Sequence, residues 1–139
     1  MKKTLFLAMA AICLLSGCKQ KNADDEAAPL LAEIEQLYRQ GDYRAALDSI
    51  ESLRAHFPKA VDARRKVLRI WQEASLKMAQ ADIAVTDSLL QATTAQMNAE
   101  KRIYERNMLG VKKDSLQARY EALIGVVRMI RKRMDGIHK

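Results

Sequence analysis

The side chains that most often perform chemistry in proteins are scarce in this chain of 139 residues, which has 2 cysteines and 2 histidines. His56 and His138 are far apart, and neither has the neighbouring His, Asp or Glu spacing of a metal site. The sequence contains no glycine-rich phosphate loop, no serine-centred nucleophile turn and no carboxylate pair in an apolar setting. We therefore expect no enzymatic activity, no catalytic residue, no metal and no cofactor.

The N-terminal segment has the layout of a secretory signal. Lys2 and Lys3 precede an uncharged, mostly apolar run from Thr4 to Leu15, and small residues follow before Cys18. The run of 12 residues is too short to cross a bilayer of about 30 Å as a helix. We therefore expect residues 1–17 to be a signal peptide that is removed rather than a part of the fold.

The tetrapeptide Leu15-Ser16-Gly17-Cys18 resembles the lipobox of bacterial lipoproteins. In that family the cysteine thiol receives a diacylglycerol and the chain is cut just before it, so the resemblance implies lipidation of Cys18. Cys13 would leave with the signal peptide, and no free thiol would remain. Multiple acyl chains anchor a protein stably on a membrane. Resemblance to envelope lipoproteins also implies the outer membrane, because Lys19 replaces the Asp that marks inner-membrane retention in some bacteria; either face of that membrane is left open.

Residues 18–28 are polar and lack hydrophobic periodicity, which predicts a solvated tether. The acidic cluster Asp24-Asp25-Glu26 within it faintly resembles the surface-export tag of some lipoproteins. Its position and the nearby lysines depart from that pattern. We therefore interpret it as part of the tether.

The next segment predicts two short helices. Pro29 suits a first helical position, and Gly41 ends the first apolar pattern. Asp42 is placed to cap the second helix, and Pro58 stops it. The apolar residues at helical spacing are Leu30, Ile34, Leu37 and Tyr38 in the first helix and Tyr43, Ala46, Leu47, Ile50, Leu53 and Phe57 in the second.

The run from Tyr38 to Leu47, with Gly41-Asp42 at its turn, Ala46 after it and Pro58 at the end, resembles a tetratricopeptide (TPR) repeat. The resemblance implies a TPR-like helical region over residues 29–80, similar to units of outer-membrane assembly lipoproteins, and contact with a protein partner. The position one repeat length after Gly41 lies within an uninterrupted helical stretch, so no second repeat follows. A solenoid groove is therefore not expected. The candidate partner contacts are Tyr43, Arg64, Arg65, Lys66 and Arg69.

Residues 59–109 lack Gly and Pro, which permits one helix of about fifty residues and about 75 Å. A fresh helix start at Thr86-Asp87 is the slightly favoured alternative. Trp71 lies on the apolar stripe of this stretch and is expected in the core, and the methionines are expected to fill an interhelical seam. Gly110 to Asp114 is expected to turn, with Asp114 or Ser115 capping the last helix.

The last helix has the most regular pattern, with a 3.5-residue repeat that predicts packing against another helix. Its members are Leu116, Tyr120, Leu123, Val127, Ile130, Met134 and Ile137. The nearest partner is the preceding stretch, so residues 81–139 predict a long antiparallel helical hairpin. The expected fold class is all-α, with a TPR-like helical hairpin followed by this coiled-coil-like hairpin. The alternative is a homo-oligomer that shares the 116–137 face between chains.

Charge is concentrated at the C-terminus. The chain from Cys18 onward carries 22 basic and 17 acidic residues, and residues 109–139 alone carry 8 basic and 3 acidic ones. The basic patch of this arm consists of Arg128, Arg131, Lys132 and Arg133. Such a patch suits a helix C-terminus, an anionic lipid surface or an acidic protein, and no nucleic-acid-binding motif accompanies it.

These observations predict a lipid-anchored envelope protein that acts as a helical adaptor between proteins. The alternative is a periplasmic chaperone with a basic helical arm, or a protein that binds anionic surfaces. A chaperone of this kind would share the heptad face between chains, whereas an adaptor would bury it within one chain.

Overall fold

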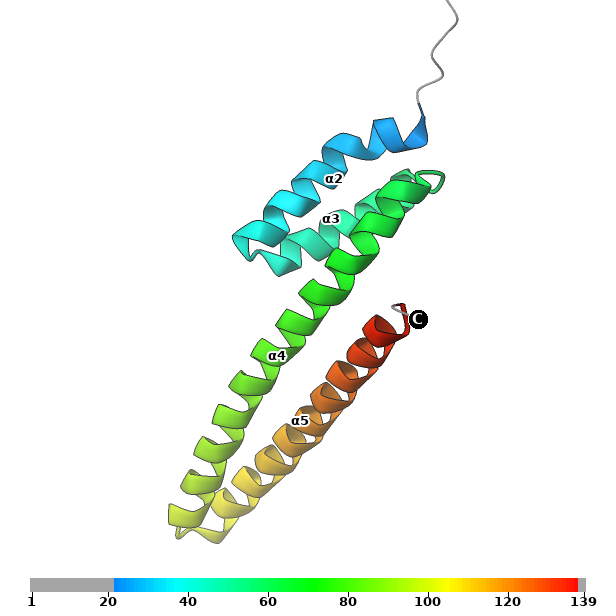
Figure 1. The fold of residues 1–139 in the computed structure, drawn as a ribbon. Helices are drawn as coiled ribbons and strands as arrows, with labels where there is room; N and C mark the ends of the chain where they lie inside the picture. The colour runs from blue at the N-terminus through cyan, green and yellow to red at the C-terminus, as the bar shows by residue number, and fades with distance from the viewer. Residues whose placement is uncertain (1–21, 138–139) are drawn as a thin grey trace, which may run out of the picture.

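The computed structural model describes residues 22–137, and within this range the chain forms four α-helices and no strand. Helices α2 and α3 pack on one end of the long helix α4, and α5 returns beside the other end (Figure 1). An all-α fold with two helical hairpins, α2 with α3 and α4 with α5, is therefore confirmed, and the start of α4 also packs on the first hairpin to form a three-helix bundle. The predicted signal peptide and the lipidation of Cys18 lie outside the described residues.

Helix α2 spans Ala23–Gln40 and begins earlier than the sequence analysis predicts. Asn22 is the N-cap, and the first turn is acidic, which complements the positive end of the helix dipole. Residues 23–28 are thus helical rather than a tether, and Pro29 lies inside the helix instead of starting it. The burial of Ala27 gives this first part of α2 a tertiary reason to be ordered.

The acidic first turn of α2 also serves another helix. Ala60, the N-cap of α4, forms no side-chain cap. Asp24 takes over that role, since its Oδ1 accepts a hydrogen bond of 2.8 Å from the backbone N–H of Ala63. Asp24 therefore ties the start of α2 to the start of α4.

The turn between α2 and α3 follows the prediction. Gly41 has φ of 81°, a left-handed conformation that favours glycine, and its N–H donates to the carbonyls of Leu37 and Tyr38. Asp42 then caps α3 (Tyr43–His56) by accepting from the N–H of Ala45 at 3.1 Å. The core of this three-helix bundle is apolar and contains Ala27, Ile34, Ala46, Ile50, Leu53, Ala60, Ala63 and Val67.

Helix α4 runs without a break over Val61–Ala99, 39 residues. The favoured break at Thr86-Asp87 is wrong, because Thr86 is buried in the middle of the helix and is no N-cap. Asp87 instead accepts a hydrogen bond from Gln91, one turn later in the same helix.

The turn of the long hairpin also lies elsewhere than predicted. Helix α5 spans Ile103–Ile137, so Gly110, Asp114 and Ser115 are inside it. The chain turns at Glu100, whose Oε1 accepts from the N–H of Arg102 at 2.9 Å. A glycine inside a helix costs only about 1 kcal/mol, so Gly110 does not end α5.

A regular seam joins α4 and α5. The heptad residues of α5 from Leu116 to Met134 are half-buried, as the repeat predicts. Their α4 counterparts alternate between small or polar residues and large apolar ones, namely Gln72, Ala79, Thr86 and Thr93 with Leu76, Ile83, Leu90 and Met97. Among the described helices α5 contacts only α4. The heptad face is thus buried within one chain.

Candidate functional site

A second stripe runs along α4 beside the seam that packs on α5. Its positions 71, 75, 78, 82, 85 and 89 recur at alternating intervals of four and three residues, and each directly precedes a seam residue, a rotation of about 100° around the helix. The apolar members are Trp71, Met78, Val85 and Leu89, whereas Ser75 and Asp82 are polar. Because Val85 and Leu89 are exposed, α4 presents apolar side chains that the described helices cover only in part.

Two adjoining cavities meet at Trp71, and together we name them the junction groove. The first, of about 280 Å³ between α4 and α5, is lined by Trp71, Gln72, Ser75, Val126, Met129, Ile130 and Arg133. The second, of about 320 Å³ between α3 and α4, is lined by Leu47, Asp48, Ile50, Glu51, Arg54 and Trp71. The groove therefore lies where the short hairpin meets the C-terminal arm of the long one.

The junction groove is apolar at its centre and carries charged side chains of both signs at its edges. On the α5 wall, Val126 is 37 % exposed and Met129 is 59 % exposed. The guanidinium of Arg54 lies 5.7 Å from the centre of the Trp71 ring, a cation–π contact. Within residues 22–137 neither Arg54 nor Arg133 forms an ion pair. These two arginines can therefore take an anionic group from a bound molecule, whereas Asp48 and Glu51 lie at the α3 edge.

Trp71 is partly buried against the core of the three-helix bundle, as predicted, but it is also the shared wall of both cavities. The methionines divide in two. Met97 and Met134 lie on the seam, whereas Met108 and Met129 are exposed, so the prediction of a purely seam-filling role is wrong for these two. The sequence analysis does not predict Val126 and Met129 as site residues. The pattern that could have indicated them is that each is apolar and lies next to a heptad position of α5.

Tyr43 and Arg69, both predicted partner contacts, belong to a polar network away from this groove. The Tyr38 hydroxyl donates to Oε2 of Glu73 at 2.6 Å, and Nε of Arg69 donates to Oε1 of Glu73 at 2.8 Å. The ring of Tyr43 lies 5.7 Å from that of Tyr38. The network links α2, α3 and α4, so it has a structural role.

Ionisation in this network follows from its hydrogen bonds. The bond to Glu73, together with burial and the charge of the carboxylate, raises the pKa of Tyr38 to about 12. The Arg69 guanidinium, followed by the Tyr38 hydroxyl, lowers the pKa of the Glu73 carboxyl. Both residues thus keep the protonation state that the network needs over a wide pH range.

The predicted cluster of residues 64–69 lies on exposed positions of the first turns of α4. Arg64 and Arg65 line a third cavity with Arg54, Val61 and Leu68, and Arg69 pairs with Glu73. Contact of this cluster with a partner stays a prediction.

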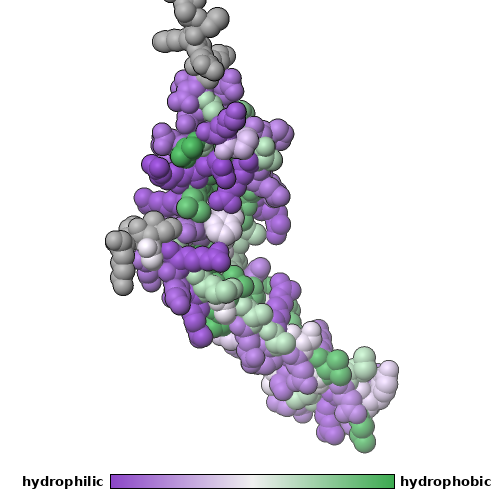
Figure 2. Space-filling view, turned by 90° about the vertical axis from the view of Figure 1, so that its right-hand side faces the viewer, coloured by the Kyte–Doolittle hydropathy of each residue, from purple (hydrophilic) through white to green (hydrophobic). Residues whose placement is uncertain are grey.

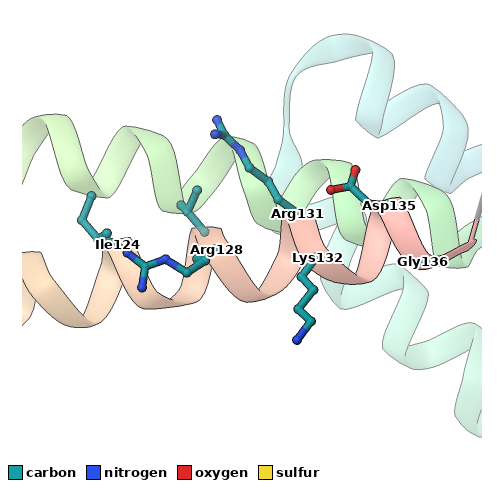
Figure 3. Close-up of a pocket in the computed structure, with 7 residues that line it drawn as sticks. Ile124, Arg128, Arg131, Lys132, Asp135 and Gly136 are labelled. Carbon is teal, nitrogen blue, oxygen red and sulfur yellow. The ribbon is translucent and has the colours of Figure 1, made fainter.

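Three of the four residues predicted as the basic patch, Arg128, Arg131 and Lys132, line a groove of about 690 Å³ on the C-terminal arm. The described lining residues of this groove all belong to α5. Figure 3 shows the side chains of Arg131 and Lys132 extending in opposite directions from the helix. Of the four predicted patch residues, Arg133 is the one that lines the junction groove.

Across the described part of the chain, no group of three or more His, Cys, Asp or Glu is arranged to hold a metal ion. None of the described helices has the length and apolar character needed to span a membrane. No protein-family model, no curated protein and no solved structure matches this chain. The functional argument therefore depends on the junction groove itself.

Proposed function

We propose that this chain is a lipid-anchored, non-enzymatic envelope protein that acts as an adaptor by holding a helix of a partner protein in the junction groove. The observation that carries the proposal is the exposed apolar wall of Val126 and Met129 opposite Trp71. Large exposed side chains in a groove between helices are typical of sites that bind another protein.

A helix is the occupant that fits this surface. The stripe of α4 repeats at intervals of three and four residues, which matches the spacing with which an amphipathic partner helix presents its apolar side chains. Arg133 at the α5 edge favours an acidic residue beside that apolar face, whereas the α3 edge carries Asp48 and Glu51 with Arg54. The partner is thus an amphipathic helix with an acidic flank on the side of α5.

The anchor is the second part of the proposal. The lipobox-like tetrapeptide ends at Cys18, four residues before the N-cap of α2. A three-helix bundle that begins so close to the lipid would be held near the membrane surface, with the long hairpin available to a partner. Placement in the outer membrane follows from the residues around Cys18 and is proposed with it.

The chaperone alternative receives less support. It needs the 116–137 face to be shared between chains, whereas this face packs on α4 of the same chain. The surface seen from the α5 side is mostly hydrophilic, with a discontinuous band of hydrophobic residues (Figure 2). An intramolecular hairpin of this kind favours the adaptor.

The test compares Met129→Glu with Met108→Glu. Both methionines are exposed on α5, by 59 % and 52 %, but only Met129 lines the junction groove. The tagged, lipidated protein is captured from detergent-solubilised envelopes, and we expect Met129→Glu to lose a partner that the wild type and Met108→Glu retain. Equal loss in both variants, or no partner above background, would contradict the proposal.

Trp71, the single tryptophan, gives a direct readout with the purified partner. We expect its fluorescence to shift when the partner helix covers the groove in the wild type and in Met108→Glu, but not in Met129→Glu. Light scattering of the isolated protein should give a monomer. A dimer that Met129→Glu dissociates would show that a second copy occupies the groove instead.

A further inference from the structure

The third cavity lies at the end of the bundle where α2 and α4 begin. It has a volume of about 310 Å³ and is lined by Arg54, Val61, Arg64, Arg65 and Leu68. We name it the arginine cavity. Three guanidinium groups border it beside two aliphatic side chains, and Val61 is 58 % exposed. A cavity with this lining suits a ligand that joins a phosphate to an apolar body.

The positive charge of the arginine cavity is poorly neutralised within the protein. Nη1 of Arg64 donates to the carbonyl of Pro58 at 2.7 Å, a neutral partner. Arg65 lies 3.6 Å from Asp62, and both side chains are largely exposed, so this pair contributes little. Arg54 lies over the Trp71 ring. All three cations thus remain available to an anion.

The local sequence adds to this positive charge. Residues 54–69 contain six basic side chains and one acidic one. The three acidic residues of the first turn of α2 begin beside the first turn of α4. Together with the one acidic residue of this stretch they number four against six basic side chains, so the end of the bundle keeps an excess of positive charge.

The arginine cavity is also close to the proposed anchor. Asp24 contacts Ala63, so the start of α2 lies beside the first turn of α4, where the cavity is. Figure 1 shows that α2 and α4 begin at the same end of the bundle. Asn22 follows Cys18 by four positions in the sequence, and an extended chain spans about 3.5 Å per residue. A lipid on Cys18 would hold the start of α2 within about 14 Å of the membrane.

We propose that the arginine cavity binds the phosphate groups of anionic phospholipids at the surface of the membrane that holds the anchor, with Val61 turned toward the lipid. This inference rests on the proposed lipidation for its geometry. Binding there would orient the bundle with α4 directed away from the bilayer.

The test uses residues 18–139 with Cys18→Ser, so that no acyl chain contributes to binding. Co-sedimentation is measured with vesicles of phosphatidylcholine alone and of phosphatidylcholine with phosphatidylglycerol. We expect binding only to the anionic vesicles. The double variant Arg64→Gln/Arg65→Gln should lower the affinity roughly 30-fold, because each basic residue at an anionic surface contributes about fivefold.

The matched control is Arg131→Gln/Lys132→Gln, which removes the same charge from the C-terminal arm. It should change vesicle binding much less. The single variant Arg65→Gln is the control for misfolding, since Arg65 is largely exposed and its ion pair is with the exposed Asp62. It should lower the affinity by a smaller factor. Equal loss in the matched control, or no binding of the wild type to anionic vesicles, would overturn the proposal.

Two further measurements separate the possible sources of the phosphate and the two proposals. An environment-sensitive fluorophore on Val61→Cys should respond to anionic vesicles. The same fluorophore on Val85→Cys should not respond, although Val85 is 60 % exposed at mid-helix. A response to inorganic phosphate without a response to vesicles would overturn the lipid assignment. Mass spectrometry of the unaltered chain from envelopes tests the acyl chains on Cys18 independently.

Discussion

Asp24 caps a helix to which it does not belong, a role that its position in the sequence does not predict. It lies in an acidic run that predicts a tether, yet its carboxylate caps α4 by accepting from the N–H of Ala63. A carboxylate cap of this kind contributes about 1 kcal/mol. Asp24 thereby links two helices that start far apart in the sequence.

We therefore expect Asp24→Ala to lower the free energy of unfolding by about 1 kcal/mol, measured by urea denaturation followed by circular dichroism. Asp25→Ala is the control, because Asp25 is exposed in the same turn and its charge interacts with the dipole alone. If the two variants lose the same stability, the capping bond is not responsible.

Tyr38 makes the network of the bundle sensitive to alkaline pH. The hydrogen bond to Glu73 raises the pKa of Tyr38 to about 12, against about 10 for a free tyrosine. The stabilisation is thus complete below pH about 10 and is lost as the pH rises toward 12, because the unfolded state releases the proton first.

Tyr38→Phe should lower the free energy of unfolding by about 1 kcal/mol at neutral pH. The difference from the wild type should shrink between pH 10 and 12, as measured by chemical denaturation across this range. A difference that stays constant with pH would show that the phenol proton is not held by Glu73.

At the level of the helices, the two hairpins use glycine differently, since one glycine ends a helix and another lies inside one. Gly41 ends α2 with φ of 81°, a conformation that a side chain would strain. Gly110 lies inside α5, where an added Cβ would meet the sulfur of Met97 at 3.9 Å, an ordinary contact. Only the first of these glycines is required by the backbone.

Gly110→Ala should therefore raise the free energy of unfolding by about 0.5–1 kcal/mol, because alanine favours the helix and fits the space. Gly41→Ala should lower it by about 1 kcal/mol or more. Thermal unfolding of both variants checks the pair. Destabilisation by Gly110→Ala would indicate a turn at this position instead of a continuous helix.

For the whole molecule, the long helix sets the distance between the bundle and the hairpin turn. The 39 residues of α4 span about 58 Å at 1.5 Å per residue. This continuity holds the junction groove in one geometry, because its walls come from α3 and α5, both of which pack on α4.

Spin labels on Lys59→Cys and Lys101→Cys, in the chain from residue 18 with Cys18→Ser, should give one narrow distance distribution near 60 Å. Pulsed electron paramagnetic resonance measures it directly. A shorter or broad distribution would indicate a break in α4, and the same labels with Thr86→Pro provide that reference, since proline disrupts a helix interior.

The sequence predicts the parts of the fold that depend on local chemistry. Gly41 and Asp42 mark the first turn because conformational freedom and capping are properties of single residues. The heptads of α5 predict its packing because large apolar residues repeat there. The matching seam of α4 was missed, since Ala79, Thr86 and Thr93 are small or polar and become buried only beside α5.

The sequence by itself determined that the chain is helical, that it folds into two hairpins and where its charge is concentrated. The tertiary structure alone decided that Asp24 caps α4, that the long hairpin turns at Glu100, and that Trp71, Met129 and Arg133 share one groove. The physical reason is that helix propensity and periodicity act over neighbouring residues. Caps supplied from another helix and grooves depend instead on which surfaces remain exposed after the helices have packed.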